Sequence, residues 1–362
     1  MSFVNDNKLP ENNYLDIPSF QSSLDLKFLQ NSYKPFWIWA ILELLGTKNF
    51  KRDYTDCIYL NMHDIATKML SLAWVPTINY RLNFGNSDQL GSFIREIFEA
   101  NPAVKRNLDA IQIQKIIQEY TGKNHIIIDK LIRYVPYRFI SPFYSGQIKG
   151  IPDGKKNLLI KEFSVAEPHI YKILDDKSLG IPKEWYNYLT INKEIISSWI
   201  KLKLIHFLER RNPNIPAISR KLEIDSDRNL NKKRLLWGDF LVVQDAYDII
   251  SGSKIDNNNF HLDHYIPWSF VQHNQLWNLS PMTPENNLKK SDSLPDWEDS
   301  FDIFADNQYR FYCWLNKNVK KKALEEYIYV LKDIFISDFP SFSDKMEETL
   351  KPQWQIASSI GY

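Results

Sequence analysis

The sequence predicts an α+β fold that is mostly helical, with a helical N-terminal domain and a smaller strand-and-helix domain toward the C-terminus. Two observations support this division. Apolar residues recur at helical spacing across residues 34–100, whereas residues 262–295 contain a short apolar-flanked strand and a proline-led helix. The chain of 362 residues is also too long for one such small domain, and its 44% apolar residues suffice for packed cores.

The N-terminal part is expected to consist mainly of helices. Residues 34–46 end in a glycine C-cap, residues 59–74 have apolar positions three and four apart, and residues 88–100 begin with an aspartate N-cap. Further helices fit residues 104–120, 182–208 and 215–222. The sequence therefore predicts a helical domain over residues 1–208.

Residues 124–144 alternate like a strand and are interrupted by prolines. The segment interleaves basic and aromatic residues, which can bind phosphates and stack on bases. We favour the other interpretation, an amphipathic element whose aromatic side chains pack inward and whose charges face solvent. The basic and aromatic residues are Lys130, Arg133, Tyr134, Tyr137, Arg138 and Tyr144.

Residues 209–235 are the expected interdomain linker, and they are strongly basic. Lys232, Lys233 and Arg234 lie immediately before the C-terminal domain, where they would contact phosphates if that domain binds nucleic acid. A solvated connection is an equally good interpretation. We expect the strand-and-helix domain at residues 236–300 and a helical extension at 301–362 that packs back on one of the domains.

One stretch, residues 262–295, carries an ordered set of polar residues. It reads LDHYIPWSFVQHNQLWNLSPMTPENNLKKSDSLP. Asp263 and His264 end the strand, and Asn278 follows His264 by 14 residues (278 − 264). Asn287 and Lys290 are three apart on a helix that Thr283 and Pro284 would start, so both lie on one face.

This pattern resembles the HNH (ββα-metal) endonuclease motif. The resemblance rests on Asp263-His264 with Ile266-Pro267, on the run from Leu276 to Leu279, and on Asn287 leading into Lys290-Ser291-Asp292. It implies a ββα-metal fold at residues 236–300 and hydrolysis of phosphodiester bonds. Beyond the motif, the arrangement looks like stand-alone bacterial HNH proteins with a helical N-terminal region, a group that includes restriction and phage-defence nucleases.

The resemblance also implies a role for each motif residue. Asp263 and Asn287 would supply oxygen ligands to Mg²⁺ or Mn²⁺, and His264 would act as the general base, since an unperturbed imidazole is largely neutral at physiological pH. Asn278 would hold the loop to the strand. Asn286 is the rival ligand, but it is four residues from Lys290, whereas the family places ligand and lysine three apart.

Lys289 and Lys290 complete the expected nucleic-acid contacts of this helix. The common zinc clip of small HNH domains is missing, because Cys57 and Cys313 both lie outside the motif. We therefore expect no structural zinc. Packing must replace the clip, and four tryptophans are apolar enough to do so, namely Trp237, Trp268, Trp277 and Trp297.

Composition narrows the remaining possibilities. The net charge of +1 requires any basic surface to be local, and two cysteines favour a reducing compartment. Because we find neither a signal peptide nor a long apolar run, we expect a cytoplasmic protein without membrane contact. The sequence thus predicts a metal-dependent endonuclease that acts on nucleic acid, with DNA favoured over RNA and RNA left open as a substrate. A homodimer and a complex with a defence-system partner are both compatible with the sequence. The alternative is a non-catalytic regulator that binds nucleic acid or a partner protein.

Overall fold

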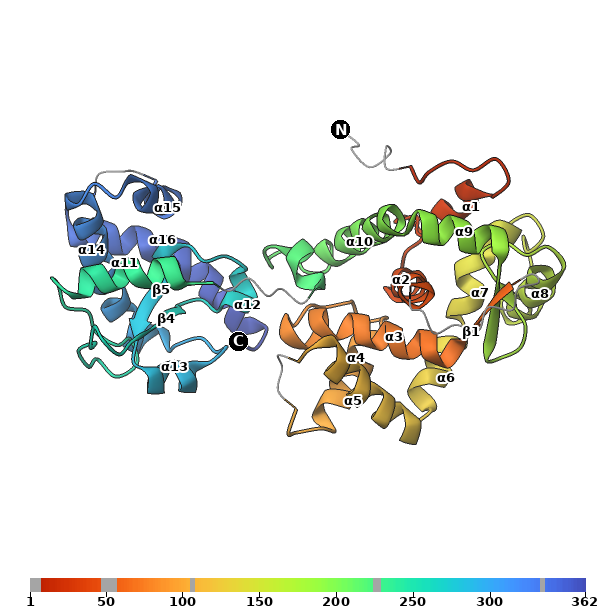
Figure 1. Cartoon of the computed structure of the whole chain (residues 1–362), viewed down its shortest axis with the longest axis horizontal. Helices are drawn as coiled ribbons and strands as arrows, with labels where there is room; N and C mark the ends of the chain where they lie inside the picture. Colours follow the sequence, from red (N-terminus) through yellow and green to blue (C-terminus); the bar gives the residue numbers. More distant parts are fainter. Residues whose placement is uncertain (1–7, 47–56, 105–107, 224–228, 333–335) are drawn as a thin grey trace. The chain divides into compact units, whose positions relative to one another are not determined.

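A computed structural model describes residues 8–46, 57–104, 108–223, 229–332 and 336–362. The protein is α+β and mostly helical, as predicted, with two small antiparallel sheets (Figure 1). It divides into two compact units. The N-terminal unit comprises the described residues up to Pro213 together with Lys221–Glu223, and the C-terminal unit comprises Asn214–Arg220 and the described residues from 229 onward.

The N-terminal unit contains ten α-helices among its described residues. They are α1 (Ile17–Ser22), α2 (Tyr33–Leu45), α3 (Met62–Trp74), α4 (Leu90–Glu99), α5 (Ala110–Lys123), α6 (Ile126–Ile132), α7 (Val135–Ile140), α8 (Asp153–Ala166), α9 (Lys183–Ile191) and α10 (Lys193–Glu209). A π-helical turn, η1 (Val75–Asn79), and a 3₁₀ turn, η2 (Ser141–Tyr144), extend α3 and α7. A second 3₁₀ turn, η3 (Ile218–Leu222), follows α10 and contains residues of both units.

The core of this unit forms around α2, which is apolar on nearly every side and is covered by α3, α7, α9 and α10. A helix that is apolar all round must be buried on all sides. Phe36 and Trp37 are accordingly fully buried, and the indole of Trp37 donates a hydrogen bond of 3.1 Å to the Tyr171 hydroxyl.

A three-stranded sheet in this unit was not predicted. Its strands β1 (Cys57–Asn61), β3 (Ser178–Pro182) and β2 (Lys172–Ile173) pair in that order, antiparallel throughout. The helix expected from residue 59 therefore begins only at Met62, where the Asn61 side chain caps it by accepting from the His63 amide at 2.7 Å. The long helix expected at 182–208 is interrupted at Asn192.

The prediction of a strand within residues 124–144 is wrong, since this segment forms α6, α7 and η2. Its buried side chains Ile127, Leu131, Val135 and Phe139 are four residues apart, which is a helical spacing. Pro136 lies in the first turn of α7, where the missing amide hydrogen costs nothing. The prolines therefore begin short helices instead of breaking a strand.

The C-terminal unit contains six α-helices among its described residues. They are α11 (Asn231–Leu241), α12 (Trp268–Val271), α13 (Pro284–Lys290), α14 (Trp297–Lys317), α15 (Lys321–Leu331) and α16 (Phe339–Ser359). A hairpin of β4 (His261–His264) and β5 (Leu279–Met282) lies among them, with a 3₁₀ turn, η4 (Leu276–Asn278), leading into β5.

One continuous core joins the hairpin to the helices around it. The four tryptophans expected to replace a metal clip are all buried: Trp237, Trp268, Trp277 and Trp297. Trp237 stacks on Phe311 of α14 with ring centroids 3.9 Å apart. The same core extends to Ala357 in α16, so the helices after residue 300 pack directly on the hairpin domain. In the parts of the chain that are described, no helix is both long and apolar enough to cross a membrane.

Candidate active site

The site is built on the β4–β5 hairpin and α13. In the antiparallel register His261 pairs with Met282, Asp263 with Ser280 and His264 with Leu279. His261 and Asp263 are two residues apart in β4, so their side chains leave the strand on the same side. Side chains of α13 contact both of them, and the helix therefore lies along that side of the strand.

The start of α13 is fixed by two polar side chains. Thr283 is the N-cap, as predicted, and its hydroxyl accepts from the Asn286 amide at 3.3 Å. The fully buried Asp248 carboxylate accepts five hydrogen bonds, from the amides of Ile250, Ser251 and Thr283, the Thr283 hydroxyl and the Asn286 side chain. Burial acts to raise the pKa of Asp248, but these donors outweigh it and hold the pKa below its usual value.

Asp248 thus links the turn before β4 to the helix after β5. The sequence analysis did not single out Asp248, although the Asp-x-x-Ser-Gly order at residues 248–252 is a typical turn signal. What the sequence could not indicate is that the same carboxylate reaches residues 35 positions away.

His264 ends β4, and its side chain is almost fully buried. Its Nε2 atom is 3.0 Å from the side-chain oxygen of Asn274, and its Nδ1 atom is 3.9 Å from Oδ1 of Asp263. Because an amide oxygen only accepts hydrogen bonds, Nε2 must carry the proton in the neutral ring. The unprotonated Nδ1 then lies on the side of Asp263.

Asn274 was missed by the sequence analysis, because it lies in an irregular loop where spacing carries no information. Two charged residues from other helices fix this loop. Lys233 of α11 forms a salt bridge of 2.6 Å with Glu326 of α15 and also donates to the Asn274 carbonyl. Glu326 in turn accepts from the Leu276 amide at 2.6 Å.

Asp263 is paired with Lys290 of α13 at 2.8 Å, and the Lys290 side chain is only 2% exposed. Burial acts to raise the pKa of Asp263, but the positive charge of Lys290 and the hydrogen bond that Lys290 donates outweigh it and lower the pKa to about 2. Asp263 is therefore a carboxylate at every physiological pH. Lys290 is the cation that pairs with this carboxylate.

The two neighbouring asparagines of α13 point to different partners. The Asn287 side-chain nitrogen is 2.9 Å from Nδ1 of His261 on β4, whereas that of Asn286 donates to Asp248. Asn287 therefore lies on the strand side with Asp263, and its oxygen has no hydrogen-bond partner among the described residues. Within the described ranges, no three His, Cys, Asp or Glu side chains form a group that could hold a metal ion.

Asn278 is fully buried and joins the loop after β4 to the start of β5. Its side chain accepts from the Ile266 amide and donates to the Ile266 carbonyl, both at 2.9 Å, while its own carbonyl accepts from the Tyr265 amide at 2.8 Å. These three bonds fix the backbone directly after His264.

The cations expected to contact nucleic acid fall into two groups. Lys232, Arg234 and Lys289 are exposed, although Arg234 also donates to the Phe260 carbonyl at 3.2 Å and Lys289 pairs with Glu285 at 2.7 Å. Lys233 and Lys290 are instead engaged by Glu326 and Asp263. Each could meet a phosphate only after its salt bridge opens.

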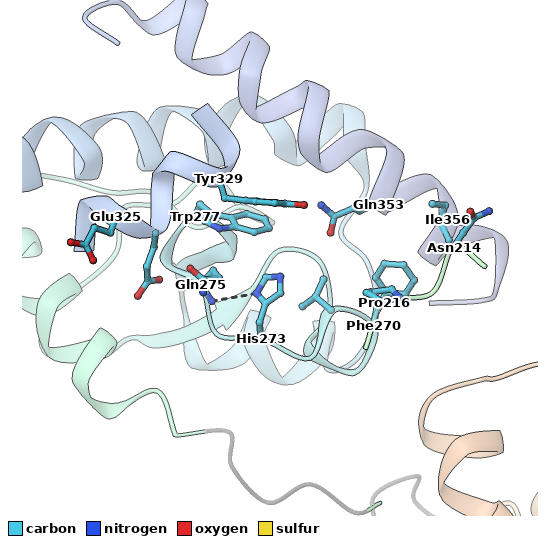
Figure 2. A pocket seen from close by; sticks show the side chains of 12 residues that line it. Asn214, Pro216, Phe270, His273, Gln275, Trp277, Glu325, Tyr329, Gln353 and Ile356 are labelled. Atoms are coloured by element: carbon cyan, nitrogen blue, oxygen red, sulfur yellow. Dashed lines mark hydrogen bonds between the residues drawn. The ribbon is translucent and has the colours of Figure 1, made fainter. Parts of the chain in front are cut away.

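A hollow of about 600 Å³ lies beside the loop that contains Asn274. Figure 2 shows His273, Gln275 and Trp277 on one side of it and Tyr329 and Gln353 facing them. Trp277 and Tyr329 stack with ring centroids 6.2 Å apart. Its lining residues include two glutamates and no lysine or arginine, so it does not have the charge of a phosphate site.

Comparison with known proteins agrees with this geometry. A family model described as HNH endonuclease matches residues 247–296, which contain Asp248, the whole hairpin and α13. Neither the curated proteins nor the solved structures include a match to the chain. The hairpin and helix at residues 247–296 thus identify the C-terminal unit as carrying an HNH endonuclease domain.

Proposed function

We propose that this protein is a metal-dependent endonuclease that hydrolyses phosphodiester bonds of DNA. The observation that carries the proposal is the grouping of a buried histidine with a fixed tautomer, a carboxylate and an amide on one hairpin and its helix. These are the groups that in-line attack of water on a phosphodiester requires.

His264 would remove the proton from the attacking water. Nδ1 is the free basic atom of its ring, because Nε2 is held by Asn274. As the oxygen attacks phosphorus, its proton passes to Nδ1, a new P–O bond forms and the bond to the leaving oxygen breaks. Lys233, which is paired with Glu326, donates to the Asn274 carbonyl and so fixes the loop. Asn274 in turn keeps the imidazole ring of His264 in its orientation during this proton transfer.

Asp263 and Asn287 would hold Mg²⁺ or Mn²⁺ through their side-chain oxygens. The ion, when bound, would neutralise charge that develops on the phosphate oxygens. The donor set fits a hard cation, since it is a carboxylate that stays ionised and an amide oxygen without another partner. Metal binding would require the salt bridge between Lys290 and Asp263 to open, and the ammonium group of Lys290 could then bind a phosphate oxygen.

A cleavage assay tests the proposal. The full-length protein is incubated with plasmid, linear duplex, single-stranded DNA and RNA, each with magnesium or manganese and with EDTA. We expect metal-dependent cutting of DNA, and a decrease of roughly 10²–10⁴-fold in His264→Ala. His125→Ala, an exposed histidine of the N-terminal unit, is the matched control and should cut like the wild type.

The biological setting that we propose is restriction or phage defence in the cytoplasm, with a second copy or a defence partner for double-strand cutting. One observation favours the alternative of a non-catalytic regulator, namely the closed Asp263–Lys290 pair. Tight DNA binding without cleavage under any metal would replace the enzyme with that regulator. Cleavage of RNA alone would change the substrate and keep the chemistry.

A further inference from the structure

A second polar hollow lies within the N-terminal unit, with a volume of about 380 Å³. It is lined by the start of α2, the segment before it, α7 with the residue before it, and the first residue of α8. The lining residues include two basic side chains, one acidic side chain and two aromatic rings, namely Lys34, Arg138, Asp153, Tyr134 and Phe28. Its volume lies in the range of pockets that hold small molecules.

Two cations meet at this hollow with too little negative charge to balance them. No salt bridge or hydrogen bond involves the Lys34 side chain in the described part of the chain, and burial together with the neighbouring Arg138 lowers the pKa of Lys34 to about 8. Arg138 pairs with Asp153 at 3.1 Å, but Asp153 is 73% exposed and is shared with Lys156 at 2.9 Å. A bound anion would supply the missing charge.

Two aromatic rings lie beside these cations. Phe28 is 72% exposed and Tyr134 is 49% exposed, although aromatic side chains are usually buried. Exposed aromatic faces next to cations are typical of sites that stack a base while binding its phosphate. Arg133 already covers part of the Tyr134 ring, with its guanidinium 5.2 Å from the centroid.

We propose that this hollow binds a nucleotide, with the phosphate between Lys34 and Arg138 and the base against Tyr134 or Phe28. A guanidinium binds phosphate oxygens with two parallel hydrogen bonds, and an ammonium adds a point charge. The assignment does not rest on the nuclease activity, because all of its residues belong to the N-terminal unit.

Binding to the full-length protein tests this assignment without any cleavage readout. Calorimetry and thermal shift would use 5′-AMP and 5′-UMP as probes, with adenosine, inorganic phosphate and a 5′-phosphorylated tetranucleotide as comparisons. We expect both mononucleotides to bind and to raise the melting temperature, while adenosine does not. Tighter binding of the tetranucleotide would assign the phosphate to a strand end instead of a free nucleotide.

Lys34→Met is the decisive variant. It should bind mononucleotides at least tenfold more weakly, Lys34→Arg should retain binding, and Lys115→Met on α5 should match the wild type. Without ligand, Lys34→Met should melt no lower than the wild type, because it removes a partly buried cation that has no partner. Unchanged nucleotide binding in Lys34→Met overturns the proposal, and so does binding of inorganic phosphate with no gain from the base.

Discussion

At the scale of single residues, the tautomer of His264 depends on one amide oxygen, that of Asn274. Asn274→Leu removes this acceptor, so the ring loses its fixed orientation. Cleavage should fall by about 10–100-fold, the usual effect of removing a residue that orients a catalytic histidine, while the magnesium requirement stays the same. Initial rates measured across magnesium concentrations check this, with the exposed Asn257→Leu as control.

A conservative change separates orientation from mere packing. Asn274→Asp keeps an acceptor for Nε2 but adds a negative charge, which stabilises the protonated imidazole. The acidic limb of the pH–rate profile should therefore move to higher pH, whereas Asn274→Leu should not move it in that direction. Identical profiles for Asn274→Asp and the wild type would exclude His264 as the group that titrates.

The pair of Asp263 and Lys290 is a second residue-scale prediction. The pKa of Asp263 is about 2 in the folded protein, below the ordinary value of about 3.9 in an unfolded chain. The pair therefore stabilises the fold above pH 4, and this contribution is lost as the pH falls from about 4 to about 2. Lys290→Met leaves a mostly buried carboxylate without its partner, which should cost about 3 kcal/mol at pH 7.

Urea unfolding at pH 7, 5 and 3 measures this effect. The difference between Lys290→Met and the wild type should shrink toward pH 3, because protonation removes the unpaired charge in the variant. Lys289→Met is the matched control, since Lys289 is exposed and pairs only along the helix surface. A pH-independent loss would mean that Lys290 acts through packing alone.

At the scale of elements, Asp248 takes over the task of a metal clip by joining the turn at 248–252 to α13. Asp248→Ala leaves several buried amides without an acceptor and should lower the free energy of unfolding by at least about 2 kcal/mol. Hydrogen exchange should accelerate specifically in α13. Asp256→Ala, which removes an exposed turn bond of 2.9 Å to Asn258, should change neither quantity, and equal exchange in both variants would contradict this role.

How far each element could be predicted from the sequence depended on the range of its interactions. The start of α13 was predictable because Thr283 and Pro284 are local signals for a helix start. The helices at 126–144 were not, since short apolar runs fit a strand and a helix equally well until packing selects one face. The pairing of β1 with β3 joins residues more than 100 positions apart, which no local pattern encodes.

In the candidate active site too, local patterns were predictable from the sequence and long-range contacts were not. Asp263, His264 and Asn287 follow a family motif, so their spacing alone was informative. Asn274 and the Lys233–Glu326 pair reach the site through tertiary contacts between a loop and two helices, since Asn274 lies 41 positions and Glu326 lies 93 positions from Lys233. The basic run at 232–234 indicated phosphate contacts, but the fold uses Lys233 to hold the loop behind His264.

At the scale of the whole molecule, the two compact units suggest a division of labour in which the N-terminal unit selects the target or senses a ligand. A fragment of residues 214–362 keeps the contact of 2.9 Å from Arg220 to the Gln272 carbonyl and the Lys233–Glu326 salt bridge. It should fold cooperatively and cut DNA with the metal requirement of the full chain, but with little preference among sequences.

Two comparisons make this prediction decisive. A fragment of residues 236–362 lacks Arg220 and Lys233, which donate to the Gln272 and Asn274 carbonyls, so only Glu326 still holds the loop, through the Leu276 amide. This fragment should therefore melt at a lower temperature and cut DNA more slowly than the 214–362 fragment. Cleavage patterns of the full chain and of 214–362 on the same DNA, together with thermal melts, measure both effects. Should 214–362 cut the same sites at the same rates as the full chain, target choice resides in the HNH unit itself, and the N-terminal unit must be assigned another task.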